Sequence, residues 1–367
     1  MDLYSRLMYS RSFDAEYRDA GTFLAQHPQP ELSQADKDEI DSYWRQFGIR
    51  FPDHSWHQMF YGVTGIHDPR FIPDCIAFPP IYRHYNDREC IVGWDDKNLY
   101  DRLVPNITFP QVLAHIYKGK AYDKDWHYCA PDDLDHVAAS IFNETGASHS
   151  IIIKATRGSQ AGKGVRVIEV NSPDEVKALI LHNLDHDYVL QQRLVQSEFM
   201  SQFCSTSVNI FRIMTWRHQG EIKVLSTSIR YGVEGFFTDV VYIKGEEIVH
   251  TVGVNDDGTV NERFISLRGR EEKPEHYHDR HIPNYQAVID MAKRGHEMLL
   301  PFDLVGWDIT LDQDNHPVCI EYNISRPGTQ LYQFANGPFA GALTDEFLAF
   351  LKQENNLKRF IPAKYRI

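Results

Sequence analysis

Three oxygen-bearing side chains near the C-terminus have the types and spacing of a magnesium site. They fall in GWDITLDQDNHPVCIEYNISRPG, residues 306–328, which reads as two strands joined by the turn residues DQDN. Asp308 lies on the first strand. Glu321 and Asn323 lie two residues apart on the second, so their side chains share one face. Two carboxylates and an amide oxygen suit Mg²⁺, whose coordination phosphate oxygens and water usually complete. The alternative is a hairpin whose polar side chains simply face solvent.

A glycine-rich loop earlier in the chain provides a place for such phosphate groups. The segment IKATRGSQAGKGV, residues 153–165, overlaps an apolar run at 151–153. It does not match the usual phosphate-loop pattern GxxxxGK followed by Ser or Thr, because its spacing is shorter and a glycine follows Lys163. Lys154 nevertheless ends a predicted strand, and glycines allow phosphate to approach backbone N–H groups. The loop residues expected near phosphate are Gly158, Ser159, Gly162 and Gly164. A plain hairpin turn is the alternative.

Three arginines lie where they can serve the same chemistry. Arg212 and Arg230 fall on predicted strands among apolar residues, where a charge is costly unless it is paired. Guanidinium groups form forked hydrogen bonds with phosphate and carboxylate groups. Arg326 follows Asn323 by three residues in a loop that Pro327 stiffens. We expect these arginines to contact a transferred phosphate or a substrate carboxylate, and ordinary structural ion pairs are the alternative.

These residues need a framework of strands, and the sequence predicts one. Helical spacing predicts helices at 173–182, 284–300 and 344–353, and also within residues 1–50, where Pro28 and Pro30 interrupt them. Residues 51–80, rich in aromatic residues, His and Pro, read as an irregular packed segment. Apolar runs predict strands at 149–155, 165–170, 188–192, 207–215, 222–229, 240–243, 248–254, 304–311 and 317–323. Strands clustered with a few helices indicate an α+β fold with mostly antiparallel sheets.

Composition limits the class of protein. The chain has 367 residues, of which 42% are hydrophobic and 24% charged, as in soluble globular proteins of two or three domains. A formal net charge of −13 argues against a general nucleic-acid binder. Five cysteines without a CxxC pair indicate reduced thiols rather than disulfides or a zinc site. No signal peptide or membrane span is evident in the sequence, so we expect a cytoplasmic protein.

The order of these motifs resembles the ATP-grasp fold over about residues 94–348. A strand ending in lysine precedes a glycine-rich loop and a second strand, and a distant Asp with a Glu-x-Asn pair follows. The resemblance implies two α+β lobes with ATP between them and a loop that covers the triphosphate. It also implies that Lys97 in DDKNLYD and Lys154 are the two ATP-binding lysines. The residues expected to hold Mg²⁺ are Asp308, Glu321 and Asn323.

The same resemblance also implies where the lobes begin and end and which residues contact adenine. The segment YVLQQRLVQ, residues 188–196, resembles the hinge between the lobes, where the family's backbone meets the adenine edge. A buried strand without a ligand is the alternative. The expected adenine contacts are Gln192, Arg193 and Leu194. The implied segments are an N-terminal helical and irregular region at 1–92, a small lobe at 93–190 and a large lobe with the metal site at 191–367.

A narrower resemblance points to the sugar-transfer-associated branch of ATP-grasp proteins, which accompanies surface-polysaccharide genes. Similar segments occur in the same order: QSEFMSQFCSTSVNIFRIMT, RYGVEGFF, IPNY, GWDIT and EYNISRPG. The chain departs from that branch in two places. Residues 233–237, VEGFF, stand where the branch tends to have an Asn and paired glycines. The first hundred residues resemble no family that we can name.

The resemblance implies an ATP-dependent carboxylate–amine ligase that works through an acyl phosphate. The implied acid is a uronic-acid-bearing saccharide, and the implied nucleophile is an amino acid or another amine. Two alternatives use the same nucleotide site. One is a kinase of a sugar or small molecule, whose phosphate stays on the acceptor. The other is a non-catalytic nucleotide-binding partner of a glycosyltransferase.

Overall fold

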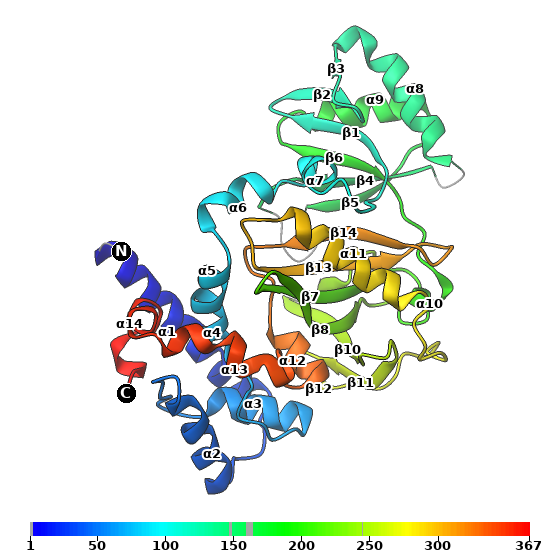
Figure 1. The fold of residues 1–367 in the computed structure, drawn as a ribbon. Helices are drawn as coiled ribbons and strands as arrows, with labels where there is room; N and C mark the ends of the chain where they lie inside the picture. Colours follow the sequence, from blue (N-terminus) through cyan, green and yellow to red (C-terminus); the bar gives the residue numbers. More distant parts are fainter. Residues whose placement is uncertain (1–2, 147–148, 159–163, 244) are drawn as a thin grey trace.

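The computed structural model of this chain describes residues 3–146, 149–158, 164–243 and 245–367. Its strands form a smaller and a larger sheet, and helices from both ends of the chain gather beside the larger one (Figure 1). All strand pairs within these described ranges are antiparallel. The predicted α+β class with mostly antiparallel sheets is therefore confirmed.

The smaller sheet has six strands in the order β3-β2-β1-β6-β4-β5. Their bounds are β1 Val112–Tyr117, β2 Lys120–Asp123, β3 Tyr128–Cys129, β4 Ser150–Ala155, β5 Val165–Glu169 and β6 Tyr188–Gln192. Helices α8 (Leu134–Glu144) and α9 (Pro173–His182) pack against each other and against this sheet (Figure 1). Ile151 and Ile153 of β4 share this core with Val176 of α9. This packing fixes the strand on which the neighbouring Lys154 is the next-to-last residue.

The larger sheet has eight strands in the order β12-β11-β10-β8-β7-β13-β14, and β9 pairs with β10. Their bounds are β7 Ile210–His218, β8 Glu221–Tyr231, β9 Val240–Ile243, β10 Glu246–Val254, β11 Val260–Ser266, β12 Gly269–Arg270, β13 Leu304–Leu311 and β14 Pro317–Asn323. Helices α11 (Tyr285–Met298) and α12 (Gln330–Asn336) lie on opposite faces. Successive residues of β7 show this, because Ile213 packs into the core with α11 and Met214 into the core with α12.

The N-terminal region forms a helical layer against the α12 face of the larger sheet. Its elements are α1 Leu3–Gln26, α2 Gln34–Arg45, α3 Ser55–Thr64, α4 Asp74–Ile76, a π-helical turn Ala77–Ile81 and α5 Tyr82–Tyr85. The Phe60 ring lies 5.8 Å from the Phe334 ring of α12. The Gln333 side chain bonds both backbone groups of Ile72, at 2.7 and 2.9 Å. The N-terminal region is thus fixed to the larger sheet through one continuous core.

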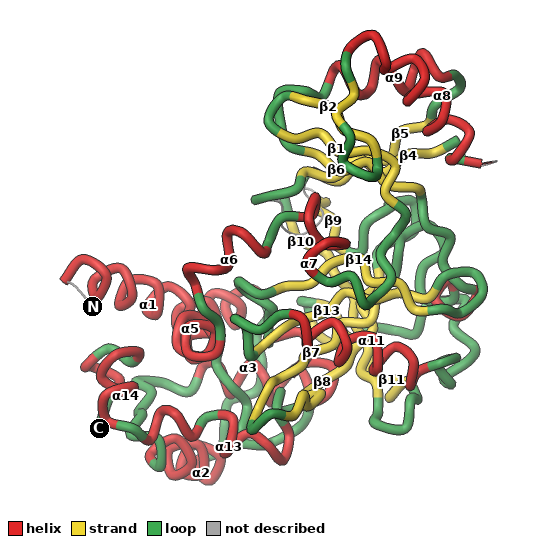
Figure 2. The backbone as a smooth tube through the Cα atoms, turned by 45° about the horizontal axis from the view of Figure 1, so that its top comes forward, coloured by secondary structure: helices red, strands yellow, loops and turns green. Residues whose placement is uncertain are grey.

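A short connector leads from this helical layer to the smaller sheet. It contains α6 Arg88–Trp94, a 3₁₀ helix Lys97–Leu99 and α7 Tyr100–Leu103. Figure 2 shows the helical layer on the side of the larger sheet that lies away from the smaller sheet. The connector therefore brings Lys97 to the region between the two sheets.

Two predicted segments differ in kind from the structure, and several others differ only in their bounds. The helix predicted at 344–353 is divided into α13 (Thr344–Phe347) and a 3₁₀ helix (Ala349–Lys352), and α14 (Glu354–Phe360) follows. Side chains three apart align in a 3₁₀ helix, so Phe350 and Leu351 reach the core that Phe347 and Leu348 enter. The segment predicted to be irregular at 51–80 contains α3. Five predicted elements match residue for residue: 173–182, 188–192, 240–243, 304–311 and 317–323.

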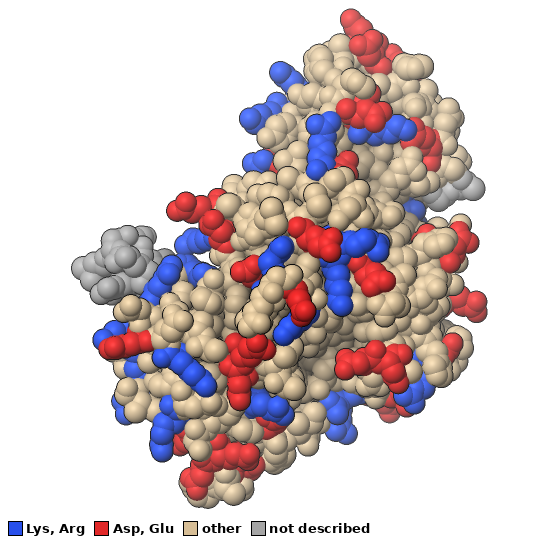
Figure 3. Space-filling model, in the orientation of Figure 1, with Lys and Arg blue, Asp and Glu red and all other residues tan. Residues whose placement is uncertain are grey.

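The molecular surface carries both signs of charge. Figure 3 shows acidic and basic side chains interspersed on one face, where the described residues form no extended basic area. Among the described residues, no helix is both long enough and apolar enough to cross a membrane. The five cysteines all carry free thiols.

Candidate active site

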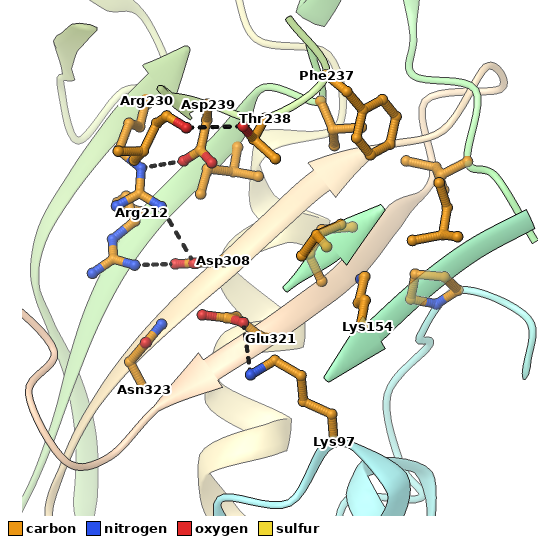
Figure 4. Close-up of a pocket in the computed structure, with 18 of the residues that line it drawn as sticks. Lys97, Lys154, Arg212, Arg230, Phe237, Thr238, Asp239, Asp308, Glu321 and Asn323 are labelled. Carbon is orange, nitrogen blue, oxygen red and sulfur yellow. Dashed lines mark hydrogen bonds and ion pairs between the residues drawn. The ribbon is translucent and has the colours of Figure 1, made fainter. Parts of the chain in front are cut away.

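A cavity of about 340 Å³ lies between the two sheets and collects most of the predicted site residues (Figure 4). The smaller sheet contributes Lys154 on β4 and Gln192 on β6. The larger sheet contributes charged side chains from β7, β8, β13 and β14. Charged groups gather around Asp308 and Glu321, whereas Phe237 lies at the other end (Figure 4). The cavity therefore has an ionic end and an apolar end.

The three predicted metal ligands lie together at the ionic end. Asp308 is directly opposite Glu321 in the β13–β14 ladder, and Asn323 pairs with Gly306 two residues further along. The Asp308 residue is 3% exposed. The Asn323 Nδ2 atom is buried and has no hydrogen-bond partner in the described part of the chain. Two carboxylates and one amide oxygen fit a hard divalent cation such as Mg²⁺.

Two lysines act on Glu321. The Lys97 Nζ atom is 3.4 Å from Glu321 Oε2 (Figure 4), and the charge of Lys154, on the smaller sheet, also acts on this carboxylate. Burial opposes ionisation of Glu321, but the charges of Lys97 and Lys154 bring its pKa below the ordinary value. Burial lowers the pKa of Lys154 to about 8, and the charge of Glu321 opposes that shift. Both ammonium groups therefore lie where phosphate oxygens would find cationic partners.

Asp308 is paired with two arginines. The Arg212 Nη1 atom lies 2.5 Å from Asp308 Oδ1, and Arg212 Nη2 donates to the carbonyl of Pro327 at 2.6 Å. The Arg230 Nη2 atom is 3.7 Å from Asp308 Oδ2, and Arg230 Nε pairs with Asp239 (Figure 4). Burial raises the pKa of Asp308 to about 6, against the lowering effect of both arginines. A cation or phosphate arriving here must compete for groups that are already paired.

Arg326 lies at the outer edge of the cavity and contacts the N-terminal region. Its Nη2 donates to Glu16 Oε1 at 3.0 Å, and its guanidinium carbon is 4.1 Å from the centre of the Phe78 ring. The Arg326 side chain is 47% exposed, compared with 11% for Arg212. Of the three predicted arginines, Arg326 is the one most accessible to a molecule arriving from solvent.

The apolar end is a slot suited to a flat base. Its apolar lining includes Ile152, Val165, Leu194, Ile210 and Phe237. Of the three predicted adenine contacts, Gln192 and Leu194 line the cavity. Arg193 is not among the described lining residues, and its Nη1 atom lies 3.7 Å from Glu169 Oε1. Its guanidinium carbon also lies 5.5 Å from the centre of the ring of Phe237, a lining residue, so the side chain packs beside the slot.

Only the two ends of the predicted phosphate loop fall within the described residues. Gly158 and Gly164 have φ angles of 67° and 83°, which residues with side chains rarely adopt. The Ala155 N–H donates to the carbonyl of Gly164 at 3.0 Å, which closes the β4–β5 hairpin. Ser159 and Gly162 lie outside the described residues, so the phosphate-binding role of the loop stays a prediction.

Three acidic residues of the cavity were not predicted from the sequence: Asp95, Asp239 and Glu247. Burial raises the pKa of Asp95, although Lys97 opposes the shift. Asp95 had a sequence signal, because it lies two residues before Lys97. Asp239 follows the segment that departs from the ATP-grasp branch, where no motif indicates a role. Its pairing with Arg230 is visible only in three dimensions.

Comparison with known proteins identifies the family. A family model described as sugar-transfer associated ATP-grasp matches residues 80–346. No curated protein matches the chain. Among solved structures, the ATP-grasp ligase PsnB complexed with minimal precursor has a TM-score of 0.42 and 14% identity over 72% of this chain. This chain covers 63% of the PsnB chain.

Two further solved structures are similar. D-alanyl-alanine synthetase A from Vibrio cholerae O1 biovar eltor has a TM-score of 0.41 and 13% identity, over 75% of this chain and 68% of its own. The D-cycloserine synthetase DcsG has a TM-score of 0.39 and 13% identity, over 70% of this chain and 72% of its own.

Proposed function

Because this chain belongs to the family of sugar-transfer-associated ATP-grasp proteins, we propose that it is an ATP- and Mg²⁺-dependent carboxylate–amine ligase. Family membership confirms the ATP-grasp resemblance drawn from its motifs. In the proposed reaction ATP phosphorylates a carboxylate, and an amine attacks the acyl phosphate to give an amide, ADP and phosphate. The family's description supports a saccharide as a substrate, and we propose that the acid is a uronic-acid-bearing saccharide. The nucleophile is an amino acid or another amine, and the setting is surface-polysaccharide biosynthesis in the cytoplasm.

The observation that carries this proposal is the convergence of both signs of charge on one cavity between the sheets. Glu321 faces Lys97 at 3.4 Å, and the adjacent Asp308 contacts Arg212 at 2.5 Å. Phosphoryl transfer depends on positioning and on charge stabilisation rather than on a covalent protein nucleophile. A cavity rich in paired charges, open to an apolar slot, suits a nucleotide whose base is flat and whose phosphates are anionic.

Each group has a distinct proposed role in binding ATP. The slot bordered by Gln192 and Leu194 receives adenine, with the backbone of Arg193 beside them, and Lys97 and Lys154 hold phosphate oxygens. The loop residues Gly158, Ser159, Gly162 and Gly164 cover the phosphates. Asp308, Glu321 and Asn323 would hold Mg²⁺, which neutralises charge on the transferring phosphoryl group.

The three arginines serve the reacting centre. Arg212 and Arg230 lie beside Asp308, where they stabilise negative charge that develops during phosphoryl and acyl transfer. Arg326 is accessible at the cavity edge and holds the carboxylate of the acid. We assign residues 93–190 and 191–367 to the two lobes, and residues 1–92 to a region that contributes to substrate recognition.

This function can be tested by measuring ADP and phosphate release with a panel of uronic acids and amino acids, offered singly and in pairs. We expect release with at least one pair, and we expect none when Mg²⁺ is removed. ADP without free phosphate, together with a phosphorylated acceptor, would identify a kinase instead. An absence of ATP binding by calorimetry would contradict the nucleotide site itself.

A further inference from the structure

Residues that precede the family's matched segment contact Arg326, which lines the cavity where the acid substrate is expected. That segment begins at residue 80, whereas Glu16 on α1 and Phe78 both contact the Arg326 side chain. Arg326 itself lines the cavity. A long N-terminal helix therefore brings a carboxylate to the place where the acid substrate is expected.

Glu16 is held in place by the packing of α1. Phe13 and Tyr17, on either side of it in sequence, are buried in the core that the helical layer shares with the larger sheet. The Asp14 carboxylate accepts a hydrogen bond from the Tyr365 hydroxyl at 2.9 Å, which ties α1 to the C-terminal end of the chain. The Glu16 side chain is 13% exposed. Its carboxylate is therefore held beside Arg326 rather than being a mobile surface group.

The surroundings of Arg326 contain more carboxylates than cations. The charge of Arg326 acts to lower the pKa of three carboxyl groups, those of Glu16, Asp19 and Asp74. The charge of Arg18 also acts to lower the pKa of Asp19. Burial raises the pKa of Glu16, and the Asp19 charge adds to that effect although Arg326 opposes it. Burial likewise raises the pKa of Asp74, to about 6. A further positive charge beside Glu16 would be stabilised there.

We propose that the Glu16–Arg326 ion pair is a divided acceptor site, in which Arg326 takes the carboxylate of the acid and Glu16 binds the ammonium group of the amine and accepts its proton. This proposal rests on the ligase function proposed above. Each substrate replaces the half of the ion pair that has its own sign of charge. The expected nucleophile is a primary aliphatic amine that is charged in solution, such as the amino group of an amino acid.

Every proton and every bond in this step is accounted for. Glu16 takes one proton from the ammonium group and leaves a neutral amine with a free lone pair. That lone pair forms the C–N bond to the acyl phosphate, and the C–O bond to phosphate breaks. The second N–H proton leaves with the phosphate as hydrogen phosphate. The amide product carries neither charge that the ion pair recognised, so Glu16 and Arg326 can pair again once Glu16 releases its proton to water.

Hydroxylamine separates the role of Glu16 from that of the rest of the site. It is uncharged near neutral pH and traps acyl phosphates as hydroxamates, so it needs neither an ammonium site nor a base. Wild-type protein and Glu16→Gln are each given ATP, Mg²⁺ and a panel of uronic acids, first with hydroxylamine and then with a panel of amino acids. We expect Glu16→Gln to lower the ratio of amide to hydroxamate formation by about tenfold to a hundredfold, the effect of losing one charge-assisted hydrogen bond.

Two further variants serve as controls for Glu16→Gln. Glu31→Gln removes an exposed carboxylate from the same region and should leave the ratio unchanged, and Glu16→Asp should restore it in part. Equal losses of hydroxamate and amide in Glu16→Gln would show a structural role and overturn the proposal, as would an unchanged ratio. Wild-type protein that binds ATP and forms hydroxamate, but uses no amino acid, would overturn this proposal alone. Wild-type protein that forms no hydroxamate with any acid would contradict the ligase function itself.

Discussion

The charged residues in and beside the cavity form an inner end around Asp308 and Glu321 and an outer end made of Arg326 and Glu16. The two ends differ in how their charges are balanced. At the inner end, Asp308 is paired with Arg212 and Arg230 of the larger sheet and Glu321 with Lys97 of the connector, and Asp308 is 3% exposed. At the outer end, Arg326 is 47% exposed and has its ion pair with Glu16 of the N-terminal helix. The inner groups belong wholly to the segment that the family model matches, whereas Glu16 precedes it.

We infer from this difference that the inner end carries out the chemical step and that the outer end selects the substrate. Buried, mutually paired charges cost much to rearrange, so they suit a step that is the same in every turnover. A half-exposed pair is cheaper to open and can admit different molecules. The comparison therefore predicts large effects for changes at the inner end and smaller, more selective effects toward the outside.

The largest expected effect is on stability, in Asp308→Ala. This change leaves the buried Arg212 guanidinium and the neighbouring Arg230 without their shared carboxylate, which should cost about 3–5 kcal/mol of unfolding free energy. Glu16→Ala breaks a pair that is open to solvent on the Arg326 side and should cost about 1 kcal/mol or less. Urea unfolding of both variants checks the contrast. Equal losses of unfolding free energy in the two variants would contradict the difference that we infer between the inner and the outer end.

Glu321→Ala tests the inner end by activity. Loss of this carboxylate removes a proposed metal ligand and the partner of Lys97, and we expect turnover to fall by at least about a hundredfold to a thousandfold. Glu354→Ala, which removes an exposed carboxylate paired with Lys358, is the control. Steady-state ADP release measures both. Full activity in Glu321→Ala would remove Glu321 from the proposed metal site.

Lys154→Ala should weaken ATP binding without changing the acid-binding end. One charge-assisted hydrogen bond contributes roughly 1.5–3 kcal/mol, which corresponds to an increase of about tenfold to a hundredfold in the Kd for ATP. Lys177→Ala, at a surface ion pair with Asp135, is the matched control. Isothermal titration calorimetry gives the Kd values. If the two variants bind ATP equally well, Lys154 has only a structural role.

The smallest expected effect is a pH dependence of ATP binding. Burial places the pKa of Lys154 at about 8, so the free protein loses the ammonium charge as the pH rises through that value. The charged form is the one that pairs with phosphate, so the Kd for ATP should rise by up to about tenfold per pH unit above pH 8. Lys154→Arg keeps its charge over this range and should flatten the dependence. A Kd for ATP that does not change with pH in the wild-type protein would contradict the proposed contact between Lys154 and phosphate.

The sequence predicted the inner end better than the outer one, for physical reasons. Asp308, Glu321 and Asn323 lie on one hairpin, so strand alternation alone places them together. The contact between Glu16 and Arg326 joins residues 310 positions apart, and no local pattern encodes it. Asp239 was missed because no motif marks the segment around it, although its partner Arg230 is only nine positions away. The helix at 344–353 was wrong in its length because the tertiary packing of Phe350 and Leu351 overrides local helical spacing.

The central claim is that a carboxylate is activated as an acyl phosphate, and the fate of its oxygen tests this most directly. An acid substrate labelled with oxygen-18 in its carboxylate is converted to amide in the presence of ATP, and the released phosphate is analysed by mass spectrometry. The acyl-phosphate route transfers one carboxylate oxygen to phosphate, so we predict labelled phosphate in an amount equal to the amide. Unlabelled phosphate beside an amide product would contradict the account.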